Sequence, residues 1–308
     1  MRLAVLCSPE SWYLRDLRRA AAGRHEVVAV AYPQMTASIA TPSDDLAEPT
    51  LAEPARGGCR VLSAGLPLDA FDALLVRTMP QGSLEQVVFR MDALARLAAA
   101  GPLIVNPPRS IEIAVDKFLT SALLVAAGLD HPPTIACQTA DDAMLAFETL
   151  GGDVVVKPLF GGEGRGIARV NDEAIALRVF KTLAPLGSVL YLQQFIPHDG
   201  YDLRVFLLGA RAFGMKRVNA TDWRTNVSRG ATTEPAELDA ELVDLARRAA
   251  TATGAMMAGV DILTGRDGRR YVIEVNAVPG WQALSRTLNV DVAAMVLDEL
   301  ALRTERRS

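Results

Sequence analysis

The feature that most constrains the fold is a short apolar strand that ends in a lysine and leads straight into a glycine-rich loop. Residues 154–157 read Val-Val-Val-Lys, and four glycines follow within residues 161–166. The next apolar run, residues 167–170, predicts another strand, so the loop joins strand to strand. This order excludes the P-loop and the Rossmann fingerprint, because both of those lead into a helix. Glycine lets backbone N–H groups approach phosphate oxygens, but a tight hairpin also needs glycine, so the loop alone leaves both interpretations open.

The first third of the chain alternates short apolar runs with helical patterns, which is typical of a parallel βαβ sheet. The predicted elements are strands at 3–7, 27–31, 73–77 and 103–105 and helices at 12–22 and 84–100. Residues 33–58 are rich in proline, alanine, threonine and acidic residues without any period, so we expect a loop there. Two prolines at 107 and 108 mark a boundary, after which residues 110–127 predict a helix.

Beyond residue 134 the pattern indicates two mixed lobes. A small lobe is predicted from strands at 134–137, 154–157 and 167–170 and helices at 141–150 and 172–183. A second, antiparallel lobe is predicted from strands at 190–193, 202–208, 211–218, 257–262 and 271–275, a helix at 235–253, and a helix at 293–302 packed on its outside. The predicted fold class is therefore α/β with α+β lobes, divided into a parallel-sheet domain (1–105), a small lobe (106–187) and a large lobe (188–308).

Composition restricts the partners. The formal net charge is -4 and the pI is about 5.5, so nucleic acid and anionic membrane are poor partners, although a local basic cleft can still hold a small anion. No apolar run reaches the roughly 18 residues that would span a bilayer, and no signal peptide is apparent. The three cysteines are widely spaced, which suggests neither disulfides nor a zinc site and makes a reducing cytoplasm the expected location. The three histidines also lack ligand spacing, and we assign them no chemistry.

Oxygen-bearing side chains end two predicted strands near the C-terminus. Asp261 ends one strand, and Glu274 and Asn276 end the next, two residues apart and so on the same face. Three oxygen donors without sulfur or imidazole suit a hard cation such as Mg²⁺. The alternative is a half-exposed strand with solvated polar residues, but Val272 and Val275 look buried, and unpaired acids among them would be unfavourable.

Basic residues lie between these two regions. Arg204 and Arg217 fall within apolar strands, where an arginine usually faces a carboxylate or another fixed anion. Arg224 and Arg229 follow in a polar segment, and each alone is best explained as a solvated surface charge. Together with two lysines and a divalent cation, such arginines would neutralise a triphosphate during phosphoryl transfer.

As an ordered set, these pieces resemble the ATP-grasp superfamily and specifically its RimK-like amino-acid ligases. The resemblance spans roughly residues 100–290 and implies an ATP-grasp fold behind an N-terminal pre-ATP-grasp domain. The matching residues are Asn106, Asp116-Lys117, Gly128, Pro133-Thr134, 156–158, 161–166, 193–196, 202–204, 224–226, 259–261 and 274–280.

The resemblance implies a role for each matching residue. Lys117 and Lys157 would contact ATP phosphates beneath a lid that contains Gly161, Gly162 and Gly164. Gln194 and Phe195 would form the adenine hinge, Asp202 would hold the ribose, and Arg224, Thr225 and Asn226 would line the nucleotide and phosphate site. The metal ligands would be Asp261, Glu274 and Asn276, for two magnesium ions with Mn²⁺ as an alternative. Arg204, Arg217 and Arg229 would lie near the phosphates or the activated carboxylate. One departure is Gln194, where the family commonly has Glu, which puts fine nucleotide preference in doubt.

The chemistry implied by the resemblance is the joining of a carboxylate and an amine through an acyl phosphate, with ATP converted to ADP. Small-molecule carboxylate and amino-acid substrates are implied, with glutamate added to a pterin-like or deazaflavin-like cofactor favoured over a protein tail or a carrier protein. A homo-oligomer is left open. Arg77, at the end of a predicted parallel strand, is the candidate for binding a substrate carboxylate, although a surface arginine at a strand end fits the sequence nearly as well. Trp281 fits either a substrate wall or the core.

Three alternatives remain open on the sequence. One is a ligase resembling D-alanine–D-alanine ligase or glutathione synthetase. The residues at 224–226 and 274–276 favour the RimK-like branch over it. Another is a non-catalytic ATP-binding regulator, which would tolerate loss of metal ligands that are all present here. The last is a binding module for an anionic metabolite, which would release no ADP.

Overall fold

The computed structural model describes residues 1–39, 59–162 and 164–307. These form two compact units, one of Met1–Glu112 with Gly280–Ser308 and the other of Ile113–Pro279. The regions expected as a small lobe (106–187) and a large lobe (188–308) fall largely within the second unit, but residues 106–112 and Gly280–Ser308 belong to the first. Within the described residues, no helix combines the length and the hydropathy needed to cross a bilayer.

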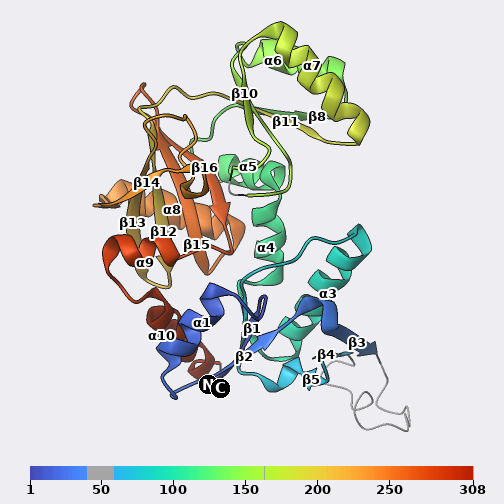
Figure 1. The fold of residues 1–308 in the computed structure, drawn as a ribbon, viewed down its shortest axis with the longest axis vertical. Helices are drawn as coiled ribbons and strands as arrows, with labels where there is room; N and C mark the ends of the chain where they lie inside the picture. Colours follow the sequence, from blue (N-terminus) through green and yellow to red (C-terminus); the bar gives the residue numbers. More distant parts are fainter. Residues whose placement is uncertain (40–58, 163, 308) are drawn as a thin grey trace. The chain divides into compact units, whose positions relative to one another are not determined.

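The first unit is built on a four-stranded parallel sheet (Figure 1). Its strands are β1 (Arg2–Leu6), β2 (Glu26–Val30), β6 (Ala73–Val76) and β7 (Leu103–Val105), in the order β2-β1-β6-β7. The connecting helices are α1 (Trp12–Ala21) and α3 (Leu84–Ala100). Both central strands are almost fully buried, as their continuous apolar runs require in a parallel sheet. The predicted parallel βαβ organisation is confirmed.

A small antiparallel sheet also belongs to this unit. It consists of β3 (Met35–Ile39), β4 (Cys59–Ser63) and β5 (Leu66–Pro67), with short 3-10 turns η1 (Tyr32–Gln34) and η2 (Leu68–Ala70). The prediction of a loop at residues 33–58 is therefore wrong as far as Ile39, because β4 supplies a distant partner strand that the local sequence does not reveal. Its remainder, residues 40–58, lies outside the described residues.

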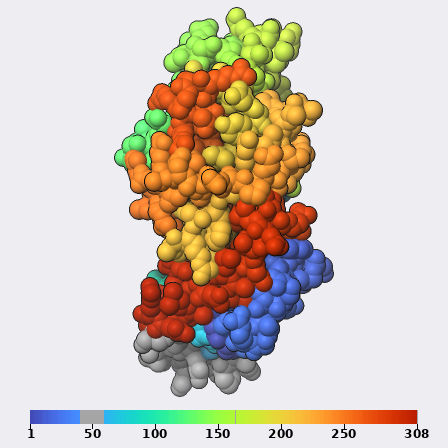
Figure 2. Space-filling view, turned by 90° about the vertical axis from the view of Figure 1, so that its left-hand side faces the viewer, coloured from blue at the N-terminus to red at the C-terminus, as the bar shows by residue number. Residues whose placement is uncertain are grey.

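The N-terminal and C-terminal segments of the chain both belong to the first unit. Helix α10 (Val292–Glu305) packs on α1 and β7, and α9 (Gln282–Leu288) precedes it. Figure 2 shows the dark red C-terminal residues beside the blue N-terminal ones. The predicted packing of this helix on the large lobe is wrong, because the apolar face of α10 is buried in the unit that contains the N-terminus.

The second unit contains two antiparallel sheets. The smaller has the order β10-β9-β11-β8, with β8 (Thr134–Cys137), β9 (Val154–Lys157), β10 (Ala168–Val170) and β11 (Leu190–Gln194). Helices α6 (Ala140–Thr149) and α7 (Glu173–Leu183) pack side by side against it (Figure 1), and η3 (Ala184–Leu186) follows them. The glycine loop joins β9 to β10, as predicted.

The larger sheet has the order β14-β13-β12-β15-β16, from β12 (Tyr201–Leu208), β13 (Arg211–Val218), β14 (Thr232–Ala236), β15 (Met257–Thr264) and β16 (Arg270–Asn276). Helix α8 (Ala240–Thr253) packs on β12, β15 and β16, and η4 (Val227–Arg229) precedes β14. The helix predicted at 235–253 starts at Ala240 instead, because Pro235 lies in the edge strand β14 and Asp239 accepts the N-cap bond from Leu242.

The helix predicted at 110–127 is two helices, α4 (Pro108–Val115) and α5 (Lys117–Ala126). The break falls at Asp116, whose side chain accepts a hydrogen bond from the Leu119 N–H at 3.0 Å and so caps α5. This cap fixes Lys117 in the first turn of α5, where α5 packs against β16. A local polar side chain thus sets the position of a predicted site residue.

Candidate active site

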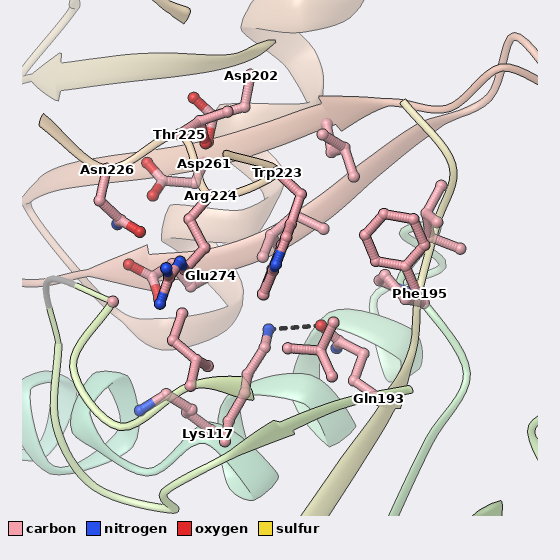
Figure 3. A pocket seen from close by; sticks show the side chains of 18 of the residues that line it. Lys117, Gln193, Phe195, Asp202, Trp223, Arg224, Thr225, Asn226, Asp261 and Glu274 are labelled. Carbon is pink, nitrogen blue, oxygen red and sulfur yellow. Dashed lines mark hydrogen bonds between the residues drawn. The ribbon is translucent and has the colours of Figure 1, made fainter. Parts of the chain in front are cut away.

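A pocket in the second unit collects most of the predicted site residues from both sheets, α5 and the glycine loop (Figure 3). Those that line it are Lys117, Lys157, Gly161, Gly162, Gly164, Gln194, Phe195, Asp202, Arg217, Arg224, Thr225, Asn226, Asp261 and Glu274. Arg204, Arg229 and Asn276 do not line it, although Arg204 contacts Asp261 and Arg229 contacts Gly164, which do. Arg77 belongs to the other unit.

Lys157 is at one end of a part-buried hydrogen-bond chain. Its Nζ donates to Gln193 Oε1 at 2.6 Å, the bond drawn as a dashed line in Figure 3. Gln193 Nε2 lies 2.8 Å from His131 Nε2, and His131 Nδ1 lies 2.7 Å from the carbonyl oxygen of Val272. The carbonyl can only accept, so His131 carries its proton on Nδ1 and accepts from Gln193 through Nε2. Burial lowers the pKa of His131 to about 4, which keeps this ring neutral.

The charge of Lys157 is held without a direct counterion. Burial lowers its pKa to about 8, while Glu274 raises it and Lys117 lowers it. Gln193 is an uncharged acceptor, so it orients the ammonium without neutralising it. A lysine presented in this way keeps its charge for an anionic ligand.

Lys117 ties the glycine loop to α5. Its Nζ donates to the carbonyl oxygen of Gly161 at 2.6 Å, and its backbone N–H donates to that of Leu159 at 3.4 Å. Gly164 approaches Asn226 so closely that an added Cβ would lie 2.5 Å from Asn226 Oδ1, and its φ is positive. Arg229 Nη2 also donates to the Gly164 carbonyl at 3.1 Å. The loop therefore meets the polar segment after β13 across the pocket.

A cluster of carboxylates and arginines forms the opposite wall. Arg204 donates to both oxygens of Asp261, at 2.7 and 2.8 Å. Arg217 contacts Asp261 Oδ2 at 2.8 Å and also both oxygens of Asp202. Thr225 Oγ1 donates to Asp202 at 2.6 Å. The expectation that arginines in these strands face carboxylates is confirmed.

The pKa shifts in this cluster follow burial and pairing. Burial opposes ionisation of Asp261, but Arg204 and Arg217 outweigh it and lower its pKa to about 2. Burial raises the pKa of Asp202 in spite of Arg217. It also raises the pKa of Glu274, which Asp261 raises further. Glu274 has a cation only at 3.9 Å, from Arg204. Among these acids, Glu274 is the one that most needs a further positive charge in the pocket.

The proposed metal ligands occupy adjacent places on β15 and β16. Asp261 pairs with Glu274 across the strands, next to a β-bulge, and Asn276 pairs with Gly259. Asn276 Oδ1 accepts from the Val278 N–H at 2.8 Å and so shapes the following turn. No three His, Cys, Asp or Glu residues in the described part of the chain are grouped as a metal site. The oxygen donors fit a hard cation at Glu274, with Asp261 already shared by two arginines.

Aromatic rings close one end of the pocket. Phe195 and Trp223 meet edge to face with centroids 5.9 Å apart, and the Arg169 guanidinium lies 3.5 Å from the Phe195 centroid. The backbone N–H groups of Gln194 and Phe195 already donate to the carbonyl oxygens of Pro133 and Asp153. An adenine at this hinge would therefore rely on other backbone groups and on stacking.

Sequence reasoning missed Gln193, His131 and Trp223. Gln193 has a sequence signal, since it is a buried polar residue inside the apolar strand β11. His131 has none, because its partners lie 62 and 141 residues away along the chain. Trp223 directly precedes Arg224, and nothing in the local sequence sets it apart.

Comparison with known proteins agrees with this geometry. A family model described as the RimK-like ATP-grasp domain matches residues 114–300. The tetrahydromethanopterin:alpha-L-glutamate ligase of Methanosarcina acetivorans is 34% identical over 262 residues, covering 76% of this chain and 81% of that protein. The alpha-aminoadipate–LysW ligase LysX of Sulfolobus acidocaldarius is 31% identical over 202 residues, covering 64% and 73%.

A solved structure shares the fold over nearly the full length. The ATP-grasp ligase PsnB, complexed with minimal precursor, Mg and ADP, superposes with a TM-score of 0.74 at 21% identity, covering 98% of this chain and 97% of that one. The chain belongs to the RimK-like ATP-grasp family. It is an ATP-dependent carboxylate-amine ligase with an ATP-grasp fold, as the sequence predicted.

Proposed function

We propose that this ligase adds glutamate to a small pterin-like or deazaflavin-like cofactor, using ATP and magnesium. The observation that carries the proposal is the pocket itself, where Lys117 and Lys157 face a wall of paired arginines and carboxylates. The similarity to tetrahydromethanopterin:alpha-L-glutamate ligase supports the choice of substrate.

The triphosphate is proposed to lie between the two lysines and the arginine wall. Lys157 supplies the charge that Gln193 holds in place, and Lys117 joins the loop with Gly161, Gly162 and Gly164 as a lid. Phe195 and Trp223 offer the adenine a stacking surface beside Gln194. The proposed segment for the nucleotide and phosphates is Arg224, Thr225 and Asn226. Asp202 already accepts from Arg217 and Thr225, so a ribose hydroxyl would share those oxygens.

Glu274, Asp261 and Asn276 are the residues that would hold magnesium, proposed as two ions with Mn²⁺ as an alternative. When bound, the metal would neutralise negative charge on the phosphate oxygens and so favour transfer of the phosphoryl group. Arg204 and Arg217 hold Asp261 in its ionised form. Arg229, which donates to the Gly164 carbonyl, fixes the lid near the phosphates.

The proposed reaction has two steps. A substrate carboxylate oxygen attacks the γ-phosphorus, the bond to the β-phosphate oxygen breaks, and ADP leaves. The amine of glutamate then attacks the acyl carbon, loses a proton and expels phosphate, which carries away the former carboxylate oxygen. The arginines and lysines stabilise the charge that develops in both steps.

The test is ADP release with L-glutamate and a panel of carboxylate cofactors, with mass spectrometry of any cofactor that gains one glutamyl residue. With ¹⁸O in the acceptor carboxyl, the released phosphate should carry the label. Formation of AMP in place of ADP, or label in AMP, would contradict the acyl-phosphate route.

Two other functions would show different results in the same assay. A ligase for a protein tail or carrier protein, as LysX is named, would release ADP only with a macromolecular acceptor. A non-catalytic regulator would bind Mg-ATP and release no ADP with any acceptor. We further propose a cytoplasmic location, which the free cysteines Cys7, Cys59 and Cys137 support, and leave a homo-oligomer as a subject for sizing.

A further inference from the structure

The first unit places a buried arginine at the one point of its sheet where a ligand is expected. In the order β2-β1-β6-β7, the chain leaves β1 toward β2 and leaves β6 toward β7, in opposite directions. Ligands of open parallel sheets bind outside the carboxyl ends of the strands at such a switch point. Arg77 directly follows β6, and the backbone N–H groups of Arg77 and Thr78 both donate to the carbonyl oxygen of Leu6, the last residue of β1, at 3.0 and 3.1 Å.

Arg77 is buried without a counterion. Only 4% of the residue is exposed, and its Nε and Nη1 have no hydrogen-bond partner. No carboxylate of the described residues forms an ion pair with it. Burial lowers the pKa of Arg77 to about 10. Two buried guanidinium donors without an acceptor are strongly unfavourable, and cation–π contacts offset only part of this.

The surroundings of Arg77 hold it in a defined position. Its guanidinium carbon lies 4.3 Å from the ring centroids of both Tyr13 and Trp281. Those two centroids are only 4.8 Å apart, so both rings lie on the same side of the guanidinium. Trp281 is fully buried and donates from Nε1 to Asp16 at 3.0 Å. The rings therefore fix one side of the guanidinium. A side-chain hydrogen bond with Tyr13 raises the pKa of Arg77 slightly against the effect of burial, but Nε and Nη1 still have no acceptor.

Gly280 allows this arrangement. A Cβ at Gly280 would lie 2.5 Å from Tyr13 Oη, so a side chain there would displace the Tyr13 ring. Directly after Arg77 in the chain, residues 78–83 have no regular secondary structure and are mostly exposed. Arg77 therefore lies next to an exposed segment, at the end of a buried strand.

We propose that Arg77, with Tyr13 and Trp281, forms a carboxylate-binding site of the first unit. A carboxylate suits the site because its two oxygens match guanidinium donors with charge-assisted bonds. This inference rests on the proposed function, in which both substrates bear carboxylates, and it assigns one of those carboxylates to Arg77.

The test compares Arg77→Met with Arg90→Met. Arg90 is a matched control, since it is 6% exposed in the same unit but donates to the Pro80 carbonyl at 2.8 Å. Thermal unfolding is measured without ligand and with acetate, glutarate, L-glutamate or inorganic phosphate. We expect Arg77→Met to unfold at or above the wild-type temperature, and Arg90→Met to unfold below it. The carboxylate that stabilises the wild type should stabilise Arg90→Met equally and Arg77→Met no longer.

Kinetics identify the source of the carboxylate. Arg77→Met should raise KM for either glutamate or the acceptor by roughly 10- to 100-fold and leave KM for ATP unchanged. The site is refuted if Arg77→Met destabilises the chain as Arg90→Met does, if no carboxylate shifts the wild type, or if the shift survives in Arg77→Met. A shift by phosphate alone also overturns it. If Arg77→Met releases ADP with unchanged KM for glutamate and for the acceptor, the carboxylate site is refuted but the ligase activity is not. If the wild type binds a carboxylate through Arg77 but shows no turnover, the ligase activity is refuted but the site is not.

Discussion

Arg217 and Arg77 are equally buried, at 3% and 4% exposure, but their electrostatic surroundings are opposite. Arg217, in the second unit, contacts two carboxylates, and its pKa is raised by Asp261 and Asp202 in spite of burial. Arg77, in the first unit, touches two aromatic rings and no acid, and burial lowers its pKa. The charge of Arg217 is already paired with carboxylates of the protein, so this arginine mainly holds the pocket wall in place. The charge of Arg77 has no carboxylate partner in the described part of the protein and can therefore bind an anionic ligand.

The largest effect should come from removing the paired arginine. Arg217→Met leaves Asp202 and Asp261 buried with one guanidinium fewer, so we expect a loss of about 3–5 kcal/mol in the free energy of unfolding. Denaturant titration measures it, with Arg211→Met on the exposed start of the same strand as the control. If Arg217→Met were as stable as Arg77→Met is expected to be, the contrast between the two arginines would fail.

A smaller effect should follow from His131, which acts on Lys157 through Gln193 and is therefore a positioning residue. His131→Ala removes the acceptor for Gln193, so the amide can turn away from Lys157. We expect KM for ATP to rise by roughly tenfold, the size of one or two hydrogen bonds, with little change in kcat. His131→Gln, whose amide oxygen can accept from Gln193, should restore part of the affinity, and His25→Ala in the other unit should have no effect. An unchanged KM in His131→Ala would show that Gln193 needs no such support.

The smallest effect is a pH dependence of nucleotide binding. Burial lowers the pKa of Lys157 to about 8, so the buried ammonium reduces the free energy of unfolding at every pH below that value. This loss of stability disappears as the pH rises toward the ordinary pKa of lysine. A bound phosphate would favour the ammonium. The γ-phosphate of the non-hydrolysable analogue AMPPNP also titrates near neutral pH and can release a proton on binding, so the quantity compared is the difference between the wild type and Lys157→Met. We expect the wild type to take up about half a proton more than Lys157→Met at pH 8, and almost the same number at pH 6. Calorimetry in buffers of different ionisation enthalpy measures the uptake of both proteins. Equal uptake by the two proteins at pH 8 would assign the proton to another group.

The site could be predicted from sequence wherever its residues lie close together along the chain. The apolar strand before Lys157, the glycine loop and the strand ends at Asp261 and Glu274 are local patterns. The structure then pairs Asp261 with Glu274 on adjacent strands. Two errors in the predicted helix bounds also had local signals. The helix break is marked by the N-cap residue Asp116, and the edge strand before α8 is marked by Pro235.

The sequence by itself determined the parallel sheet of the first unit, the strand–loop–strand around the glycines and the residue types that hold charge. Only the tertiary structure decided how those charges are compensated. Arg77 contacts Tyr13 and Trp281, which come from opposite ends of the chain. His131 is linked to Lys157 through Gln193, which lies on another strand. The physical reason is that secondary structure follows from interactions a few residues apart, whereas the burial and pairing of a charge depend on which distant segments pack around it.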